Sequence, residues 1–259
     1  MNSTVIPVFV TYNLGVDRFV KLNELWNKVI FVDNSETKLI DLKLRRLSIV
    51  WNEMNLGYGG GANIGIEQAL SLGADWVIIM NQDLKITRKG LKKFADELKR
   101  TNPALVGPFA GSLDEKRWTT MLSSKPVDYI SGGCMAIHRD VIDKIGNFYE
   151  PYFMYYEDAD YCIRAKKSGF PLIQSMTSDI CHEDNPYQGK GSFLHECYLA
   201  RNHLLFVESQ ALLSVKLYEW SRLPKSYSEF LESDNKGGLS GIKDYLLRRF
   251  GEKIYEHRN

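Results

Sequence analysis

The chain has 259 residues, enough for one large α/β domain with a sizeable core and a short appendage. Its 33 basic and 32 acidic residues leave a net charge of +1, which gives no electrostatic reason to expect a nucleic-acid partner. Four widely spaced cysteines disfavour a zinc cluster and a disulfide framework. The longest apolar run, 76–80, is too short to span a bilayer and no signal-like segment opens the chain, so we expect a soluble, cytoplasmic protein.

Strand-like apolar runs alternate with helical patterns through the first half of the chain. This rhythm predicts βαβ units and an α/β fold with a mixed, mostly parallel central sheet. Three expected strands end in polar residues, at 11–13, 33–35 and 81–83, and ligands of open α/β sheets bind at such carboxyl ends. The expected strands are VIPVFVTYN, NKVIFVDNS, LSIVWNE and DWVIIMNQD, with a helix through IGIEQALSLG.

The middle of the chain adds further helices and an acidic segment rich in aromatic residues. GLKKFADELKR is typical of an amphipathic helix, which Asn102 and Pro103 end. YISGGCMAIHRDVIDKIG predicts a strand and then a helix closed at Gly146. In NFYEPYFMYYEDADYCIRAKKSGF, dense aromatic residues precede acidic ones, which predicts a pocket wall, and the following helix closes at Gly169.

From about Leu199 the chain is expected to be helical, with breaks at Pro224 and at the pair Gly237 and Gly238. The stretch GIKDYLLRRFGEKIY can place apolar residues on one face and basic residues on the other. Two interpretations stay open for it. It is either a solvated structural helix, or a helix that rests on a membrane surface or a partner, which includes a second copy of the chain.

A glycine-rich stretch, NLGYGGGANIG, follows an expected strand and opens a helix. Its backbone amides and the helix dipole can cradle a phosphate or lie under a ribose. Gly57, Gly59 and Ala62 also match the dinucleotide-binding spacing, but that fingerprint belongs to the first βα turn, and two strand-like segments precede this one. The alternative is that these glycines only permit a tight turn and close packing.

Carboxylates occur at two expected strand ends and at one expected helix start, where they could bind a ligand or act in catalysis. Asp33 and Asp83 each end an apolar strand, where a carboxylate can bind a ribose, a base or a hard divalent cation, or simply cap the next helix. Glu157, Asp158 and Asp160 begin a helix, and three acids exceed the need for capping. Carboxylates gathered in an aromatic-lined cleft should raise one another's pKa, which suits a general base.

Two further polar residues each allow two interpretations. His182 follows the expected strand QSMTSDICH and either completes a metal site with Asp83 or caps the strand end. Arg201 lies beside Asn202 in an apolar helix, where an arginine either pairs with a core carboxylate or reaches a phosphate. The histidines interpreted as structural are His138, His195 and His203.

Together these motifs resemble the family 2 glycosyltransferases with the GT-A fold, especially the bacterial rhamnosyltransferase-like branch that builds O-antigen and capsule glycans. VTYN and VDNS look like the family's nucleotide pocket, NxxNxGxGGGxNxG like its donor loop, and NQD takes the place of its DxD motif. The most specific match runs from SGGCMAIH to EDADYCIR, because the family places a glycine, a helix, carboxylates and an arginine in this order. The resemblance implies a Rossmann-like catalytic domain at 1–210 and a helical extension at 211–259.

The resemblance also implies a role for each residue of the site. Asp158 would be the catalytic base, while Asp83, with His182, would hold Mg²⁺ or Mn²⁺ on the diphosphate; Asn81 stands where the family has its first acid. The acceptor or sugar pocket would contain Gly132, Gly133, Glu157 and Arg201. The donor nucleotide would be bound by Thr11, Tyr12, Asn13, Asp33, Asn34, Asn55, Gly57, Gly59, Asn63 and Gln82.

The implied reaction is inverting transfer of a sugar from a nucleotide diphosphate donor to a hydroxyl of a polysaccharide or lipid-linked glycan. Rhamnose from dTDP-rhamnose is favoured over UDP-linked galactose, glucose or N-acetylhexosamine. The tail GLSGIKDYLLRRFG fits peripheral contact with the inner face of the cell membrane, and a homodimer is the alternative. Two other classes stay open: an NAD-dependent oxidoreductase, which would leave the carboxylate cluster without a role, and a non-catalytic nucleotide-sugar binding module, which Asn81 makes conceivable.

Overall fold

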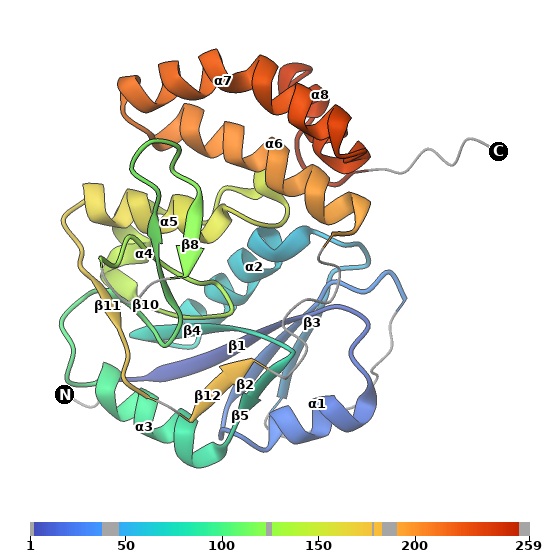
Figure 1. Cartoon of the computed structure of the whole chain (residues 1–259). Coiled ribbons are helices and arrows are strands. Elements are labelled where there is room, and N and C mark those ends of the chain that lie inside the picture. Colours follow the sequence, from blue (N-terminus) through green and yellow to red (C-terminus); the bar gives the residue numbers. More distant parts are fainter. Residues whose placement is uncertain (1–2, 38–46, 123–125, 178, 183–190, 254–259) are drawn as a thin grey trace.

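A seven-stranded mixed sheet forms the centre of the molecule (Figure 1). The computed structural model describes residues 3–37, 47–122, 126–177, 179–182 and 191–253. In spatial order the sheet contains β11 (Leu172–Gln174), β6 (Leu105–Gly107), β10 (Cys134–His138), β4 (Trp76–Asn81), β1 (Val5–Thr11), β2 (Val29–Asp33) and β3 (Leu47–Trp51). Only β10 runs antiparallel to its neighbours, so the predicted mixed, mostly parallel sheet is confirmed.

Helices cover both faces of this sheet. On one face lie α1 (Val16–Asn23) and α3 (Arg88–Leu98), and on the other lie α2 (Gly57–Ser71), α4 (Arg139–Ile145) and α5 (Glu157–Lys167). Alternate residues of β1 enter the two cores: Phe9 packs with the α1 face, while Val8 packs with the α2 face. β1 is therefore buried along its whole length and apolar from Val5 to Val10, as expected for a strand covered on both sides.

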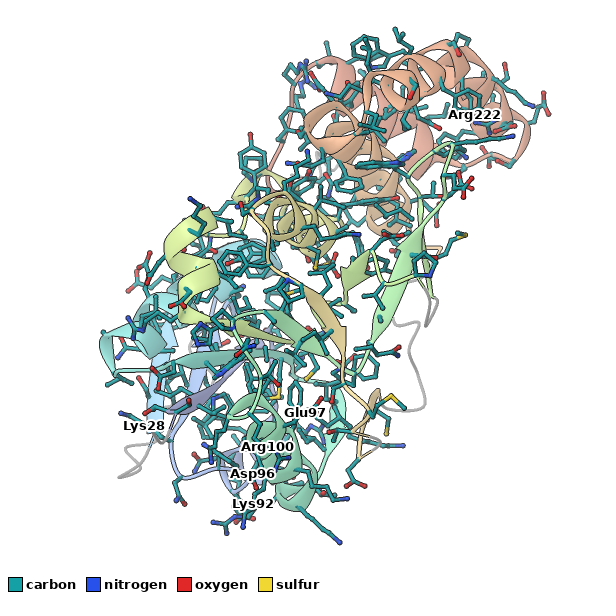
Figure 2. All side chains as sticks on the ribbon, turned by 90° about the vertical axis from the view of Figure 1, so that its left-hand side faces the viewer. Lys28, Lys92, Asp96, Glu97, Arg100 and Arg222 are labelled. Carbon is teal, nitrogen blue, oxygen red and sulfur yellow. The ribbon has the colours of Figure 1, made fainter. Side chains whose placement is uncertain are left out.

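The predicted amphipathic helix in the middle of the chain is α3. Its apolar residues Leu91, Phe94 and Leu98 are buried in the core beneath the sheet. Figure 2 shows charged residues of the same helix, among them Lys92 and Asp96, on its outer side. The helix thus closes one face of the sheet and has no part in the cavities described below.

The glycine run belongs to α2 itself, which begins earlier than the sequence predicted. Gly57 has φ +71°, a left-handed conformation that starts the helix. A Cβ on Gly65 would lie 2.2 Å from Val8 Cγ1, and one on Gly61 would lie 2.8 Å from Val10 Cγ1. Close packing of α2 against β1 therefore requires these glycines and overrides their poor helix propensity.

Two small sheets flank the central one. β12 (Ile180–His182) pairs with β5 (Leu84–Ile86), and its register sets His182 opposite Leu84, the neighbour of Asp83. The stretch QSMTSDICH was expected to form one strand; instead its first residue ends β11 and its last three form β12, in different sheets. The third sheet contains β7 (Ala110–Leu113), β8 (Thr120–Leu122) and β9 (Tyr129–Ile130).

Three C-terminal helices form a further layer above the α/β core (Figure 1). They are α6 (Phe193–Gln210), α7 (Leu213–Glu232) and α8 (Lys236–Leu246), with α8 packed along α6. The predicted break at Pro224 is wrong, whereas the break predicted at Gly237 and Gly238 lies just before that pair, between Glu232 and Lys236. α7 runs through Pro224, which is exposed, so solvent can bond the carbonyl that the proline leaves free. Gly237 lies in α8, where a Cβ would be 2.4 Å from Phe193 O of α6.

The exposed side of α7 carries an apolar stripe. None of the described helices has the length and apolar character needed to cross a membrane. Apolar residues recur every three or four positions along this side of α7, the spacing of one helix face. The α7 stripe, as we call it, consists of Leu213, Leu217, Trp220, Pro224, Tyr227 and Leu231.

Candidate active site

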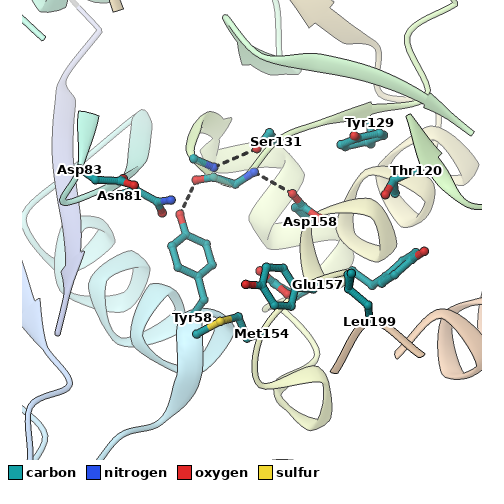
Figure 3. A pocket seen from close by; sticks show the side chains of 14 residues that line it. Tyr58, Asn81, Asp83, Thr120, Tyr129, Ser131, Met154, Glu157, Asp158 and Leu199 are labelled. Carbon is teal, nitrogen blue, oxygen red and sulfur yellow. Dashed lines mark hydrogen bonds between the residues drawn. The ribbon is translucent and has the colours of Figure 1, made fainter. Parts of the chain in front are cut away.

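Two adjoining cavities open at the carboxyl ends of the central strands. The first, the strand-end cavity, has a volume of about 500 Å³, and the second, the carboxylate cavity, about 400 Å³ (Figure 3). Their shared wall is formed by Tyr58, Asn81, Asp83, Met154 and Tyr155. A ligand could therefore extend from one cavity into the other past Asp83.

The strand-end cavity is lined by residues that follow the parallel strands. Thr11 and Tyr12 come from the end of β1, and Asn34 follows β2. Gln82, after β4, is tied to the end of β1: its Oε1 accepts from the Tyr12 amide at 2.8 Å, and its Nε2 donates to Tyr12 O at 3.0 Å. The carboxyl ends of neighbouring parallel strands thus meet at one ligand-sized opening.

The predicted donor-binding residues divide into two groups. Those that line the strand-end cavity are Thr11, Tyr12, Asn34, Asn55, Gly57 and Gln82. Those that do not are Asn13, Asp33, Gly59 and Asn63.

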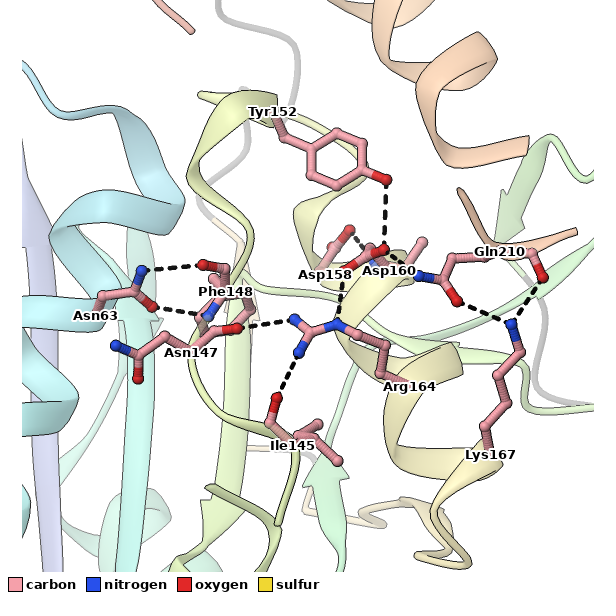
Figure 4. A network of polar contacts seen from close by, with 11 residues as sticks. Asn63, Ile145, Asn147, Phe148, Tyr152, Asp158, Asp160, Arg164, Lys167 and Gln210 are labelled. Carbon is pink, nitrogen blue, oxygen red and sulfur yellow. Dashed lines mark hydrogen bonds and ion pairs between the residues drawn. The ribbon is translucent and has the colours of Figure 1, made fainter. Parts of the chain in front are cut away.

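Two members of the second group, Asp33 and Asn63, hold backbone segments in place. Asp33 Oδ1 accepts from the Ser35 amide at 3.1 Å and from Ser35 Oγ at 2.6 Å, which fixes the turn after β2. Asn63 bonds both backbone groups of Phe148, at 2.8 and 3.0 Å (Figure 4). A Cβ added at Gly59 would lie 3.5 Å from Phe148 Cβ, so this position faces the packed segment around Phe148. Asp33, Gly59 and Asn63 thus shape the cavity from behind, whereas Asn13 is exposed and lies outside the cavity lining.

Asp158 lies in the carboxylate cavity at the start of α5, facing the predicted glycine pair. Its Oδ2 accepts from the Gly132 amide at 2.9 Å and its Oδ1 from the Ala159 amide at 2.8 Å. The Tyr58 hydroxyl donates to Gly132 O, and a Cβ at Gly132 would lie 2.9 Å from the Tyr58 ring. Glycine at this position thus lets a tyrosine and a carboxylate approach the same backbone segment.

Glu157 is the second carboxylate of this cavity, and it is only 6% exposed. Its Oε2 is buried and has no hydrogen-bond partner among the described residues. Burial and the neighbouring Asp158 raise the pKa of Glu157, and burial also raises the pKa of Asp158, against the effect of the Gly132 and Ala159 amides. An uncompensated buried carboxylate oxygen at a cavity wall is suited to accept a hydrogen bond from a ligand hydroxyl.

Asp160, the third acid of the predicted cluster, belongs to a structural network (Figure 4). It accepts from Arg164 Nε at 2.8 Å, from Gln210 Nε2 at 2.8 Å and from the Tyr152 hydroxyl at 3.4 Å. Arg164 also donates to the carbonyls of Ile145 and Asn147. The network ties α5 to α6 and to the segment before α5, so it holds the two catalytic candidates in place.

The segment that leads into α5 is held in a strained conformation. Phe153, Tyr155 and Tyr156 have φ values of 64°, 67° and 72°, a region that non-glycine residues rarely adopt. Buried Asn202 of α6 donates its side-chain amide to the carbonyls of Tyr152, Met154 and Tyr155 at 2.7–3.0 Å. The helical layer therefore maintains the aromatic wall that the sequence predicted.

A hairpin formed by β7 and β8 completes the far wall of the carboxylate cavity, to which it contributes Thr120. At its tip, Arg117 forms an ion pair with Glu219 of α7, with nitrogen to oxygen distances of 2.7 and 3.3 Å. His203 Nε2 donates to Arg117 O at 2.8 Å, and Trp118 packs on a cluster that includes Val215. Residues of α6 and α7 thus anchor a cavity wall.

The structure does not place Arg201 in the acceptor pocket, contrary to the prediction. Its side chain is 1% exposed and lines neither cavity in the described part of the chain. The guanidinium donates to Gly251 O at 2.8 Å and to Tyr152 O at 2.9 Å, with longer bonds to the carbonyls of Pro151 and Arg249. Its fork of donors is used by backbone carbonyls from two distant segments, so it joins them.

Asp83 lies at the shared wall of the two cavities and is exposed. The backbone of His182 lies opposite Leu84, but its side chain is outside the described residues. Within the described ranges no three metal-binding side chains gather in one place. One carboxylate beside the Asn81 amide fits a hard divalent cation that takes its remaining ligands from a diphosphate and water.

Several cavity residues escaped the sequence reasoning. Tyr58 is hidden within the glycine run, and His195, interpreted as structural, lines the strand-end cavity. Ser192 could have been found as the N-cap of α6, where its Oγ accepts from the His195 amide at 3.2 Å. No local pattern marked Glu252 or Lys253, which also line the strand-end cavity, as does Tyr198.

Several known sequences that are similar to this chain are named as sugar transferases. A family model described as "Glycosyl transferase family 2" matches residues 5–163. A low-salt glycan biosynthesis hexosyltransferase, Agl10 of Haloferax volcanii, is 27% identical over 65% of this chain, and the match spans only 62% of that relative. An N-acetylglucosaminyl-diphospho-decaprenol L-rhamnosyltransferase of Mycobacterium tuberculosis is 25% identical, covering 77% of this chain and 81% of its own. The dTDP-rhamnosyl transferase RfbF of Shigella flexneri is 26% identical, and the match covers 95% of this chain and 94% of that relative.

Solved structures with the same fold include a mannosyltransferase and the protein TarS. The mannosyltransferase PcManGT from Pyrobaculum calidifontis, solved with GDP-Man and Mn²⁺, has a TM-score of 0.56 at 13% identity, covering 96% of this chain and 87% of its own. TarS 1–349 of S. aureus has a TM-score of 0.55 at 15% identity, and the match covers 95% of this chain and 82% of TarS 1–349. At such identities the likeness concerns the fold, which is that of GT-A glycosyltransferases.

Proposed function

The chain belongs to glycosyl transferase family 2, and from this premise we propose that it transfers a sugar from a nucleotide diphosphate donor to a hydroxyl of a glycan acceptor. One observation carries the proposal: a cavity of strand ends and a cavity of carboxylates meet at Asp83. Family membership leaves no basis for the nicotinamide-dependent oxidoreductase that the glycine spacing allowed. Intact carboxylates in the second cavity argue against a mere binding module.

In the proposed reaction the donor nucleotide lies in the strand-end cavity and the acceptor hydroxyl in the carboxylate cavity. Asp158 removes the proton from this hydroxyl as its oxygen attacks the anomeric carbon from the face opposite the diphosphate. The bond from the anomeric carbon to the diphosphate breaks, and the diphosphate leaves with the electron pair. A single displacement of this kind inverts the anomeric configuration.

Glu157 is proposed to orient the acceptor through a neighbouring hydroxyl of the same sugar, because the reacting hydroxyl donates its single proton to Asp158. Its partnerless Oε2 can accept a hydrogen bond that no described protein group supplies. The two backbone amides on Asp158 oppose the effect of burial on its pKa and so help to keep it ionised at the pH at which a base must work. One carboxylate is thereby suited to proton removal and its neighbour to positioning.

Asp83, with Asn81 and His182, is proposed to hold Mg²⁺ or Mn²⁺ at the junction of the cavities. Such a cation would neutralise the charge that develops on the departing diphosphate. The neighbour PcManGT was solved with Mn²⁺, which supports the use of a divalent metal by proteins of this fold.

The favoured donor is dTDP-rhamnose, with UDP-linked galactose, glucose or N-acetylhexosamine as the alternative. The names of two relatives, a dTDP-rhamnosyl transferase and a decaprenol-linked rhamnosyltransferase, support this choice and a polysaccharide or lipid-linked acceptor, as in O-antigen or capsule synthesis. We place the enzyme at the cytoplasmic face of the membrane, with the α7 stripe as its contact. Leu, Trp and Tyr side chains exposed on one helix face suit the membrane interface.

The test is a binding panel of nucleoside diphosphates and nucleotide sugars, each with and without Mn²⁺, with NADH as the control. We expect dTDP or UDP compounds to raise the melting temperature in a metal-dependent way, because a ligand at 100 times its Kd stabilises the folded state by about 2.7 kcal/mol. The stabilising donor is then offered with lipid-linked acceptors. Stabilisation by NADH alone, or by no member of the panel, would contradict the proposal.

A further inference from the structure

We infer that Lys253, from the C-terminal tail, binds the diphosphate of the donor in the strand-end cavity. The inference rests on the proposed function, because it presupposes a nucleoside diphosphate in that cavity. It concerns a residue outside the segment that the family model matches, which ends at 163.

The first observation is the charge of the cavity wall. Among the described residues that line the strand-end cavity, Lys253 is the one lysine or arginine, and Asp83 and Glu252 are the acids. A diphosphate brought into this cavity would face net negative charge without the lysine. Phosphate groups in proteins are normally bound by cationic side chains or helix N-termini, and an ammonium acts there as a point charge with three donors.

The second observation is that the tail is firmly anchored at this place. The Lys253 amide donates to the Tyr198 hydroxyl at 2.8 Å, and the Gly251 amide donates to Pro151 O at 2.9 Å. Arg201 donates to Gly251 O at 2.8 Å from a fully buried position. Gly251 has φ +81°, so the chain turns back toward the cavity through a left-handed residue. This explains the buried arginine of α6: it fixes the turn that delivers the lysine.

The third observation concerns the ammonium group itself. Lys253 Nζ pairs with Asp244 Oδ2 of α8, a carboxylate that is buried and also accepts from Cys197 Sγ. The Lys253 side chain stays 21% exposed, so one ion pair does not exhaust its three donors. Asp244 thus orients a cation that a ligand in the cavity can still reach. Orientation before binding lowers the entropy that the lysine loses when the diphosphate arrives.

The α6 N-terminus adds to the same wall. Ser192, His195 and Tyr198 come from the first turns of α6 and line the strand-end cavity beside Lys253. The positive end of an 18-residue helix dipole therefore lies on the same side as the lysine. By contrast, the strand-end side contributes uncharged groups such as Thr11 and Asn34. Lys253 and the α6 dipole thus supply positive potential that opposes the acids Asp83 and Glu252, and the strand ends supply polar contacts for the nucleoside.

The experiment is calorimetric titration of UDP and dTDP, with Mn²⁺ present, into the full chain and its variants. We expect Lys253→Gln to weaken the binding of the better nucleoside diphosphate roughly tenfold or more, since hydrogen bonds to charged groups contribute this much. Lys253→Arg should restore most of the affinity. The matched control is Lys243→Gln, which removes an exposed lysine from α8 and should leave the affinity unchanged.

A second readout separates phosphate binding from a structural role. Binding of the free nucleosides uridine and thymidine, followed by ligand-observed NMR, should be the same in wild type and Lys253→Gln. Lys253→Gln leaves the buried carboxylate of Asp244 without its ion-pair partner, which can lower the melting temperature. In that case the double variant Asp244→Asn/Lys253→Gln is used, because it replaces both charges with neutral amides. The double variant should show the same weakening for diphosphates.

The outcomes distinguish the two proposals. Tight binding of a nucleoside diphosphate by wild type and by both glutamine variants would overturn this inference alone. Equal weakening for nucleosides and diphosphates would also overturn it, because a collapsed cavity affects both. If wild type binds no nucleoside diphosphate, the proposed function fails and the inference fails with it.

Discussion

The sheet region, residues 5–163, and the helical region, residues 193–253, contribute differently to the same site. The sheet region coincides with the family match and carries Asp83 and Asp158, the groups proposed for metal binding and catalysis. The helical region lies beyond that match, yet Asn202 and Glu219 hold two walls of the carboxylate cavity, and Lys253 lines the strand-end cavity.

The groups proposed to react therefore lie in the sheet region, whereas groups that hold the cavity walls in position lie in the helical region. The reacting groups follow strands and a helix start, where short stretches of sequence place them. The groups that hold those walls reach them from segments roughly 50 to 100 positions away in the chain. A change in the sheet region should therefore abolish turnover and leave the cavity intact, whereas a change in the helical region should distort the cavity and leave the chemistry available.

The largest expected effect belongs to the sheet region. Asp158→Asn removes the proposed base and should lower kcat by roughly 10² to 10⁴ fold, the usual contribution of a positioned general base. Binding of the nucleotide donor should stay within about twofold, because Asp158 lines only the other cavity. Steady-state kinetics and calorimetry measure the two quantities. Near-normal turnover by this variant would remove Asp158 from its proposed role.

The next effect tests whether the helical region maintains the aromatic wall. Asn202→Ala removes a fully buried amide that donates to three carbonyls, of which Tyr152 O keeps its bond from Arg201. We expect a loss of about 2 to 4 kcal/mol in the free energy of unfolding. Denaturant unfolding measures it. Asn147→Ala, at an exposed asparagine, is the control and should change little. An unfolding free energy equal to that of wild type would show that the segment needs no such clamp.

Breaking the hairpin anchor should have a smaller effect on stability and a selective one on the acceptor. Glu219 is 2% exposed and Arg117 about a third exposed, so Glu219→Gln should cost roughly 1 to 3 kcal/mol of unfolding free energy. The KM for the acceptor should rise, because Thr120 lies in this hairpin, while the Kd of the nucleotide stays unchanged.

The control for this change is Glu208→Gln, which breaks the solvent-exposed ion pair with Arg248 on the same helical layer. It should alter neither constant. Should Glu219→Gln raise the nucleotide Kd as much as the acceptor KM, the hairpin would not act on the carboxylate cavity in particular.

A pH series separates Glu157 from its neighbour. The pKa of Glu157 is raised by burial and by Asp158, so the folded state keeps its proton at a pH where the unfolded chain has lost it. Wild type should therefore lose stability as the pH rises from the ordinary glutamate range through the raised pKa. Glu157→Gln has no proton to lose, so its melting temperature should match that of wild type near pH 4. At alkaline pH it should exceed that of wild type by roughly 2 to 4 °C for each kcal/mol of unfolding free energy that wild type has lost.

The control for the pH series is Glu67→Gln, at an exposed glutamate of α2, whose melting curve should follow wild type throughout. Parallel curves for wild type and Glu157→Gln across the whole range would mean that Glu157 ionises in the folded state as it does in water.

The smallest effect on the fold should come from the α7 stripe. Leu217→Ser/Trp220→Ser changes two exposed residues, so the unfolding free energy should shift by no more than about 0.5 kcal/mol per site, while binding to anionic phospholipid vesicles should fall several-fold. Flotation measures vesicle binding, and Met176→Ser, at an exposed methionine outside the stripe, is the control. No vesicle binding by wild type, together with a dimer in sedimentation velocity, would assign the stripe to a second copy.

Local sequence was enough to find the core of the sheet region. Apolar runs that end in polar residues located β1, β2 and β4, because burial on both faces of a parallel strand demands continuous apolar sequence. The acidic run after dense aromatics located Glu157 and Asp158 at the start of α5 and beside a cavity. Gly146 and Gly169 marked helix ends because each adopts a positive φ there.

The sequence by itself therefore determined the central strands β1 to β4, the helix ends at Gly146 and Gly169 and the positions of the carboxylates, since each depends on neighbours in the chain. Only the tertiary structure decided that α7 continues through Pro224, that Asn63 and Asp33 serve the backbone, and that Arg201 anchors a turn which brings Lys253 to the strand-end cavity. These outcomes depend on which carbonyls, carboxylates and helices meet after folding. Side chains of the same type are interchangeable in a local pattern, and the partner across the fold decides what each one does.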